Sequence, residues 1–146
     1  MAPRLTVLDA SALVALLLGQ AGDRVALAAI KSGAAHTTST GLAEALNVLR
    51  LKGYSKSREE TAQGLADLGL TVDPVTYEDA IDMAFLQAET ERQLARSPGG
   101  TSRVGSLSLG DAACLAVARR LGAIAVMSDE TWELLGSVGV EVQAFR

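Results

Sequence analysis

The sequence predicts an α/β fold with a mostly parallel central sheet and helices on both of its faces, a three-layer α/β/α arrangement. Short apolar runs typical of buried strands alternate along the chain with longer segments of helical periodicity. Such alternation is typical of parallel sheets, because each crossover connection lays a helix against one face. A chain of 146 residues, 49% of them hydrophobic, is also large enough for a core of its own. We therefore expect residues 1–146 to form a single domain.

The N-terminal half opens with an apolar run at residues 5–8, which predicts a buried strand that ends at Asp9. Ser11 is placed to cap the helix that follows at residues 12–18. Thr40 is placed in the same way before a later helix. The patterns of this half further predict a helix at 23–31, a strand at 34–38, helices at 41–52 and 57–68, and a brief strand at 71–72.

The C-terminal half begins with a long helical pattern from residue 76 to about residue 94. The next segment, residues 97–102, has the most loop-like composition in the chain. Residues 108–121 predict a helix that is apolar almost all round and is therefore buried. A strand at 123–127, a short helix at 130–135 and a last strand at 140–145 complete the expected order.

The composition argues against several kinds of catalytic site. Cys114 is the only cysteine, so no disulfide forms within the chain, as suits a reducing compartment. It lies in an apolar run, where a small buried hydrophobic residue is a better interpretation than a reactive thiol. His36 is the only histidine. A zinc site and a Cys–His catalytic pair are therefore both poorly supported.

The apolar segment at residues 12–18 is too short to span a membrane, and no clean signal-peptide cleavage site follows it. We therefore expect a cytoplasmic protein that makes no membrane contact. The formal net charge of −4 argues against a protein that binds nucleic acid through bulk electrostatics alone. It leaves a nuclease open, because an acidic metal site itself contributes negative charge.

Two acids stand at or just after the ends of predicted strands, Asp9 and Asp129. In parallel α/β sheets, functional sites lie at the carboxyl ends of the strands, where the strand order reverses. Mg²⁺ and Mn²⁺ prefer oxygen ligands. A metal held by carboxylates polarises a phosphoryl oxygen and orients an attacking water. The pattern therefore indicates metal-assisted hydrolysis.

Each candidate acid also has a purely structural interpretation. Asp9 and Asp129 both precede predicted helices, where an aspartate serves as a cap. Asp111 completes a Ser-x-x-Asp capping box that begins at Ser108. Glu44 lies off the apolar face of its helix, where solvated glutamates are common. Taken one at a time, these residues leave both interpretations open.

Four segments carry a joint signal. They are Leu8-Asp9-Ala10-Ser11-Ala12-Leu13, Ala43-Glu44, Ser108-Leu109-Gly110-Asp111-Ala112 and Met127-Ser128-Asp129-Glu130-Thr131-Trp132. In this order, they resemble the PIN-domain family, and within it the VapC-type toxins of bacterial and archaeal toxin–antitoxin pairs. The resemblance extends over essentially the whole chain. Its most specific parts are the Asp-x-Ser-Ala opening and the Ser-Leu-x-Asp segment, and Glu44 is its least distinctive match.

This resemblance implies an endoribonuclease that cuts RNA with Mg²⁺ or Mn²⁺. By match to the family's motifs, the catalytic acids would be Asp9, Glu44, Asp111 and Asp129. Asp9, Asp111 and Asp129 would be the metal ligands. The implied partners are an RNA substrate, a cognate antitoxin and a second copy of the chain in a homodimer.

Further residues match the family's pattern or lie close to the expected site. Ser11 and Ser128 match supporting polar positions beside the first and last acids. Trp132 also fits the pattern, and we favour a core or dimer-interface aromatic there. Arg96 and Arg103 flank or lie within the expected loop, where they either contact RNA phosphates or are simply solvated.

Two other functions fit part of the pattern. Asp-dependent phosphatases use an aspartate after the first strand as nucleophile. They usually carry a second acid two residues further on, where this chain has Ser11. A receiver domain needs a lysine after a late strand, and none follows Met127. A PIN-like module that only binds RNA or protein would keep the fold and lose acids, whereas here all four are present.

Overall fold

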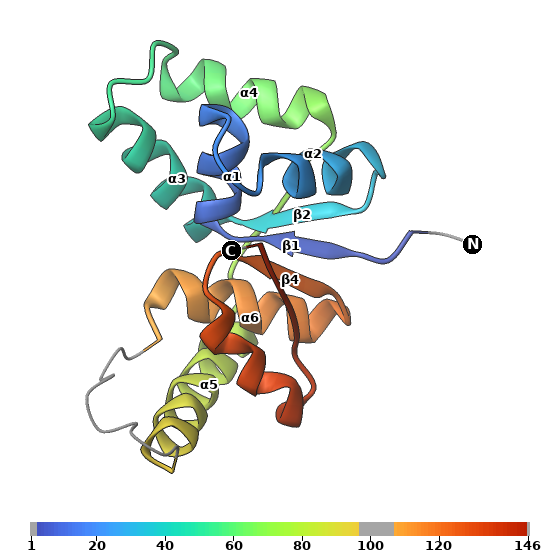
Figure 1. Cartoon of the computed structure of the whole chain (residues 1–146), viewed down its shortest axis with the longest axis vertical. Helices are drawn as coiled ribbons and strands as arrows, with labels where there is room; N and C mark the ends of the chain where they lie inside the picture. Colours follow the sequence, from blue (N-terminus) through green and yellow to red (C-terminus); the bar gives the residue numbers. More distant parts are fainter. Residues whose placement is uncertain (1–2, 97–106, 146) are drawn as a thin grey trace.

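A five-stranded parallel sheet forms the centre of the computed structural model, which describes residues 3–96 and 107–145 (Figure 1). The strands are β1 (Thr6–Leu8), β2 (Ala35–Thr38), β3 (Thr71–Asp73), β4 (Ile124–Met127) and β5 (Glu141–Ala144). Their order across the sheet is β3-β2-β1-β4-β5, and every neighbouring pair is parallel. The prediction of a mostly parallel sheet is confirmed.

Helices cover both faces of the sheet (Figure 1). One layer consists of α1 (Ala10–Leu18), α2 (Asp23–Lys31), α3 (Ser39–Leu51) and α4 (Arg58–Leu68). The other consists of α5 (Tyr77–Ala95), α6 (Leu109–Leu121) and the 3₁₀ helix η1 (Glu130–Val138). The three-layer α/β/α arrangement predicted from the sequence is therefore confirmed.

Each face of the sheet has its own hydrophobic core, and β1 contributes to both. Successive side chains of a strand point to opposite faces. Val7 accordingly packs with residues of α5, α6 and η1, whereas Leu8 packs with residues of α1, α2, α3 and α4. Residues Ala112 to Ala118 of α6 are all buried, as the apolar pattern predicted. The two cores fix the positions of the helices that surround the end of β1.

The residues predicted to cap α1 and α3 are both wrong. Asp9, not Ser11, caps α1, and Thr38, not Thr40, caps α3. In both places the strand runs directly into the helix, so its last extended residue is the N-cap. The backbone angles φ and ψ are −79° and 176° at Asp9, and −89° and 156° at Thr38, as a cap requires.

The short helix expected at 130–135 is the 3₁₀ helix η1, which extends to Val138. It contains Gly136 and the β-branched residues Thr131 and Val138. These residues have low α-helix propensity, and the tighter 3₁₀ turn is common in such short connections.

The strand order reverses between β1 and β4. The chain moves outward from β1 to β2 and β3, and then returns to place β4 and β5 on the other side of β1. Open α/β sheets bind ligands at the carboxyl ends of the strands beside such a reversal. Asp9 follows β1 there, and Asp129 lies two residues beyond the end of neighbouring β4.

Within residues 3–96 and 107–145, no single helix is long and apolar enough to cross a membrane. In the same described residues, α1 and α2 meet that criterion of length and composition only as a pair, with a bend of 101° between them. Both helices contribute residues to the core that contains Leu8.

Candidate active site

Asp9 is a buried carboxylate at the end of β1. Its side chain is 5% exposed. Its Oδ1 atom accepts hydrogen bonds from the Ala12 N–H at 2.8 Å and the Ser11 hydroxyl at 2.6 Å. Burial raises its pKa from 3.8 to about 6, against the lowering effect of these two hydrogen bonds. A negative charge at this position is therefore costly unless a cation lies nearby.

Asp111 lies in the first turn of α6. Its backbone N–H donates to the Ser108 hydroxyl at 3.1 Å, so Ser108 caps α6 as the sequence predicted. Burial raises the pKa of the Asp111 carboxyl, and the negative charge of Glu44 raises it further. The side chains of Ser108 and Trp132 act in the opposite direction. Asp111 therefore takes part in the helix cap and also belongs to an acidic cluster.

Glu44 extends from α3 to the start of α6. A Cβ atom added to Gly110 would lie 2.4 Å from Glu44 Oε2, so the carboxylate rests directly against this glycine. Its negative charge raises the pKa of both Asp9 and Asp111. The side chain is exposed, as expected for a surface glutamate, yet it belongs to the same cluster.

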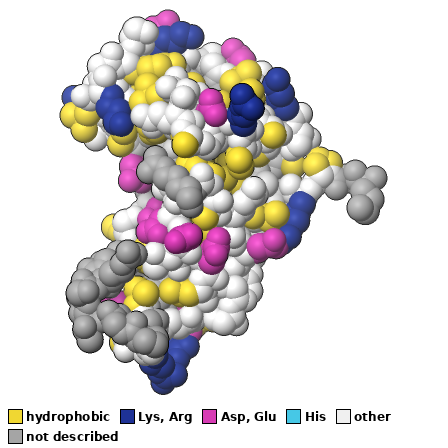
Figure 2. Space-filling view, viewed as in Figure 1, with side chains coloured by type: hydrophobic (Ala, Val, Ile, Leu, Met, Phe, Trp, Pro, Cys, Tyr) yellow, Lys and Arg dark blue, Asp and Glu magenta, His cyan; other side chains and the backbone are white. Residues whose placement is uncertain are grey.

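Asp129 connects β4 to η1 and caps η1, since its Oδ1 atom accepts from the Thr131 N–H at 2.9 Å. Its negative charge raises the pKa of Asp111. The structure therefore brings together all four acids predicted from the sequence. Figure 2 shows acidic side chains gathered at the waist of the molecule, between the two helical layers.

The donor chemistry of this cluster fits a hard divalent cation. Within residues 3–96 and 107–145, however, no three aspartate, glutamate, histidine or cysteine side chains are arranged around a single metal position. Mg²⁺ usually keeps several waters and is bound by one or two carboxylates together with substrate phosphates. The arrangement is thus compatible with such an ion and differs from a closed protein cage.

Three residues that the sequence analysis did not select help to position the acids. The Thr37 hydroxyl donates to the Leu8 carbonyl at 2.8 Å and ties β2 to the end of β1. Gly110 leaves the space that the Glu44 carboxylate occupies. Ser108 was recognised only as a cap, although its hydroxyl also lowers the pKa of Asp111. A glycine in the first turn of a helix was the one available signal, because glycine is unfavourable there without a packing reason.

Trp132 and Cys114 are buried in the core on the α6 side. The Trp132 Nε1 atom has no hydrogen-bond partner of normal geometry in the described part of the chain, although its N–H lowers the pKa of Asp111. The core interpretation of Trp132 is confirmed. Burial raises the pKa of the Cys114 thiol well above its ordinary value, as expected for an unreactive cysteine.

The remaining sequence candidates add no contact to the cluster. Ser128 lies between β4 and Asp129, and in the described residues its hydroxyl makes no hydrogen bond with the four acids. His36 pairs with Asp73 on the neighbouring strand, with 2.6 Å between Nδ1 and Oδ2. Arg96 caps the end of α5. Arg103 and the expected loop at 97–102 lie outside the described residues.

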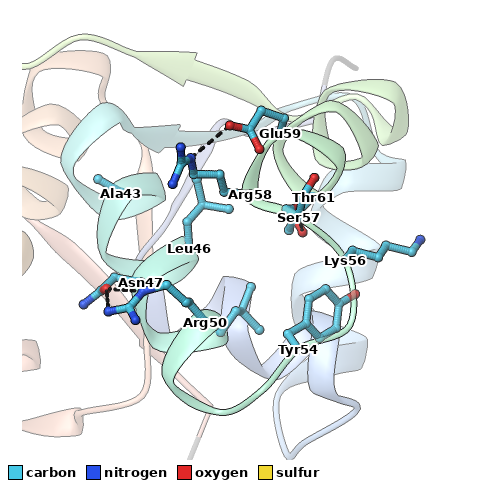
Figure 3. Close-up of a pocket in the computed structure, with 11 residues that line it drawn as sticks. Ala43, Leu46, Asn47, Arg50, Tyr54, Lys56, Ser57, Arg58, Glu59 and Thr61 are labelled. Atoms are coloured by element: carbon cyan, nitrogen blue, oxygen red, sulfur yellow. Dashed lines mark hydrogen bonds and ion pairs between the residues drawn. The ribbon is translucent and has the colours of Figure 1, made fainter.

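Cavities border α3 in the described part of the chain. A small one, of about 200 Å³, includes Ser11 and Glu44 in its lining. A larger one, of about 640 Å³, lies between α3 and α4 and includes none of the four acids. Figure 3 shows that Arg50 and Arg58 at the larger cavity are bound to Asn47 and Glu59, respectively.

Comparison with known proteins agrees with the geometry. A family model described as PIN domain matches residues 6–136, a range that includes all four acids. The chain is also similar to the crystal structure of Mycobacterium tuberculosis VapC20, described as a sarcin-ricin loop cleaving toxin. The TM-score is 0.54 and the identity 22%, over 82% of this chain and 86% of that chain. No curated protein matches. Because the family match spans most of its length, the chain belongs to the PIN domain family.

Proposed function

We propose that this protein is a metal-dependent endoribonuclease and the toxin component of a VapBC-type toxin–antitoxin pair. The observation that carries the proposal is the convergence of Asp9, Glu44, Asp111 and Asp129 beside the strand-order reversal. They come from separate segments, and Asp9 is buried and Asp111 partly buried despite their charge. Such an arrangement costs stability, which supports a functional reason for it.

The electrostatics of the cluster support metal dependence. An RNA phosphodiester is negatively charged, so carboxylates alone would repel it. A bound Mg²⁺ or Mn²⁺ would reverse the local sign and supply a Lewis acid. Asp9 is the best central ligand: in the described residues both of its hydrogen bonds fall on Oδ1, and Oδ2 remains available. Asp111 and Asp129 would hold the ion directly or through water.

The other side chains of the cluster would orient the reacting groups. The Ser11 hydroxyl fixes the rotamer of Asp9 through its 2.6 Å hydrogen bond. Ser108 and Trp132 favour the ionised form of Asp111. Glu44 reaches the cluster from a different helix and would position the attacking water or a second ion. Ser128 stays a predicted supporting residue at the other end of the site.

The direct test is cleavage of RNA by purified protein. We expect Asp111→Asn to lower the rate by at least roughly a hundredfold, the scale of losing one strong electrostatic contributor. Asp67→Asn, at an exposed position on α4, is the matched control and should leave the rate unchanged. EDTA should stop cleavage, and Mg²⁺ or Mn²⁺ should restore it. Full activity of Asp111→Asn, or activity in EDTA free of contaminating ribonuclease, would contradict the proposal.

The proposed substrate is RNA with exposed single-stranded nucleotides, which implies a cytoplasmic protein. M. tuberculosis VapC20 is described as cleaving the sarcin-ricin loop. Loops are suitable targets because their unstacked bases can be splayed out towards a protein. Comparing cleavage of a hairpin loop with cleavage of its fully paired counterpart tests this part of the proposal.

The larger cavity supports an antitoxin partner. Leu46 and Leu49 line it with apolar side chains. Tyr54 borders it as well (Figure 3). Arg50 and Lys56 supply positive charge around it, whereas Arg58 there is paired with Glu59. This combination suits an apolar segment with acidic neighbours, and the rest of the antitoxin would extend from there over the acids. The test is co-purification of the Leu46→Asp variant with a protein encoded alongside. If as much of that protein co-purifies as with the unmodified chain, this assignment is wrong.

An exposed stripe on α5 supports a homodimer. Tyr77, Ile81 and Phe85 recur every fourth residue and are 78%, 58% and 43% exposed. They therefore form one apolar face of the helix. Leu49 of α3 is buried in the core and contributes nothing to such a dimer surface. Figure 1 shows α5 at the edge of its layer, away from the other helical layer.

A further inference from the structure

The cavity of about 200 Å³ joins the acidic cluster to a cation. Ser11 and Glu44 line it together with Gln20 and Lys52, and the apolar side chains of Val14 and Val48 lie between them. Glu44, Val48 and Lys52 are spaced four residues apart, so they lie on one face of α3. The rise of a helix places Lys52 about 12 Å along the axis from Glu44. The cavity therefore leads from the acids towards a positive charge.

The polar groups at the far end are available for a ligand. Lys52 is exposed at the end of α3, and in residues 3–96 and 107–145 its ammonium group forms no ion pair. Gln20 follows α1, and in the same residues its side-chain amide makes no hydrogen bond, so two donors and one acceptor remain. A cation and an amide beside an apolar surface match the phosphate, base edge and ring face of a nucleotide.

On the basis of the proposed RNA cleavage at the acidic cluster, we propose that this cavity binds the nucleotide next to the scissile bond. Lys52 contacts the phosphate on the far side of that nucleotide. Val14 and Val48 pack against its base or ribose, and Gln20 hydrogen-bonds a base edge or the 2′-hydroxyl group. The volume admits one nucleoside and no longer segment. The subsite would thus hold the RNA so that the next phosphate lies over Asp9.

The test compares Lys52→Met with Lys31→Met. Methionine keeps a long flexible stem and removes the charge. Lys31 is an exposed lysine at the end of α2 that lines neither cavity at α3. Cleavage of a short single-stranded RNA is measured for both variants and the unmodified protein. Binding of the same RNA is followed by fluorescence anisotropy at several salt concentrations, with Asp111→Asn added to each protein so that the RNA stays intact.

Loss of one phosphate contact has a specific signature. We expect Lys52→Met to raise KM about tenfold and to leave kcat within about twofold, because the contact holds substrate and transition state equally. The dependence of log affinity on log salt should become shallower by about 0.7, the contribution of one phosphate on a single strand. Lys31→Met should change neither quantity.

Several results would overturn the subsite while leaving the nuclease intact. One such result is that the unmodified protein cleaves RNA and that Lys52→Met and Lys31→Met both have the same KM and the same salt dependence as it has. Another is loss of affinity of Lys52→Met for an antitoxin without any change in RNA binding, which would assign the cavity to that protein. If the unmodified protein neither binds nor cleaves RNA with Mg²⁺ or Mn²⁺ present, the proposed function itself fails.

Discussion

Replacing Asp9 with asparagine should show separately how much stability the acidic cluster costs the fold and how much it contributes to RNA cleavage. An asparagine Oδ1 atom accepts the same bonds from Ser11 and Ala12 that Asp9 accepts, and asparagine is as good a helix cap as aspartate. The substitution therefore removes a charge and leaves packing and capping unchanged. RNA cleavage should fall by at least roughly a hundredfold. The metal-free protein should at the same time become more stable near pH 8.

The size of the gain follows from the pKa of Asp9. In the folded protein it lies at about 6, compared with an ordinary value of 3.8. A difference of about two pH units corresponds to about 3 kcal/mol that the charged form costs the folded state. Most of this cost is gone near pH 4, where Asp9 is protonated in the folded state and about half protonated in the unfolded state; the cost is complete above about pH 7. Repulsion from Glu44 and Asp111 is part of it.

The assay is denaturant or thermal unfolding of both proteins in EDTA between pH 4 and pH 8. At pH 8 we expect Asp9→Asn to be more stable by about 1–3 kcal/mol, which is about 3–9 °C in Tm for a chain of this length. The gap should close as the pH falls through 6 towards 4. Mg²⁺ should stabilise the unmodified protein more than the variant. Equal stabilities at pH 8, or a gap that persists at pH 4, would refute the reasoning.

Three more outcomes are expected. Gly110→Ala should lower kcat about tenfold, because its Cβ would lie 2.4 Å from Glu44 Oε2 and displace that carboxylate. Circular dichroism should show that the fold is retained. An unchanged kcat would mean that Glu44 does not belong to the site. Arg120→Met should lower the free energy of unfolding by about 1–2 kcal/mol without affecting kcat, because it removes the ion-pair partner of the buried Asp79. Urea unfolding measures this change, and undiminished stability would contradict the prediction. Ile81→Glu should convert the proposed homodimer to a monomer in small-angle scattering, whereas a monomer before substitution would exclude that interface.

The fold could be predicted because each local pattern agreed with the arrangement of the whole chain. The apolar run before Asp9 and the nearly all-apolar segment of α6 both identify elements buried in the structure. Element ends were less predictable. Asp9 and Thr38 are simultaneously the last extended residue and the helix cap. A serine or threonine one or two positions later has the same local propensity, so composition alone does not distinguish them.

The site was predictable to a different degree at each acid. Asp9 and Asp129 follow strands, so the rule for parallel sheets places them at one edge of the sheet. Asp111 and Glu44 lie on helices, and their positions depend on how α3 packs against α6. The contact between Glu44 and Gly110 is of this kind. No periodicity within either segment encodes it, and only the resemblance to a family pointed to Glu44.

The division of the molecule into two cores has a consequence for when activity can arise. Asp9 and Glu44 are held by the helical layer that packs on Leu8, whereas Asp111 and Asp129 are held by the layer that packs on Val7. Each layer therefore carries half of the acids, and neither possesses a site by itself. If the protein is the proposed ribonuclease, a chain in which one layer has opened cannot cleave RNA. On the proposed function, catalysis would thus depend on completion of folding, and partly folded or nascent chains would lack the activity.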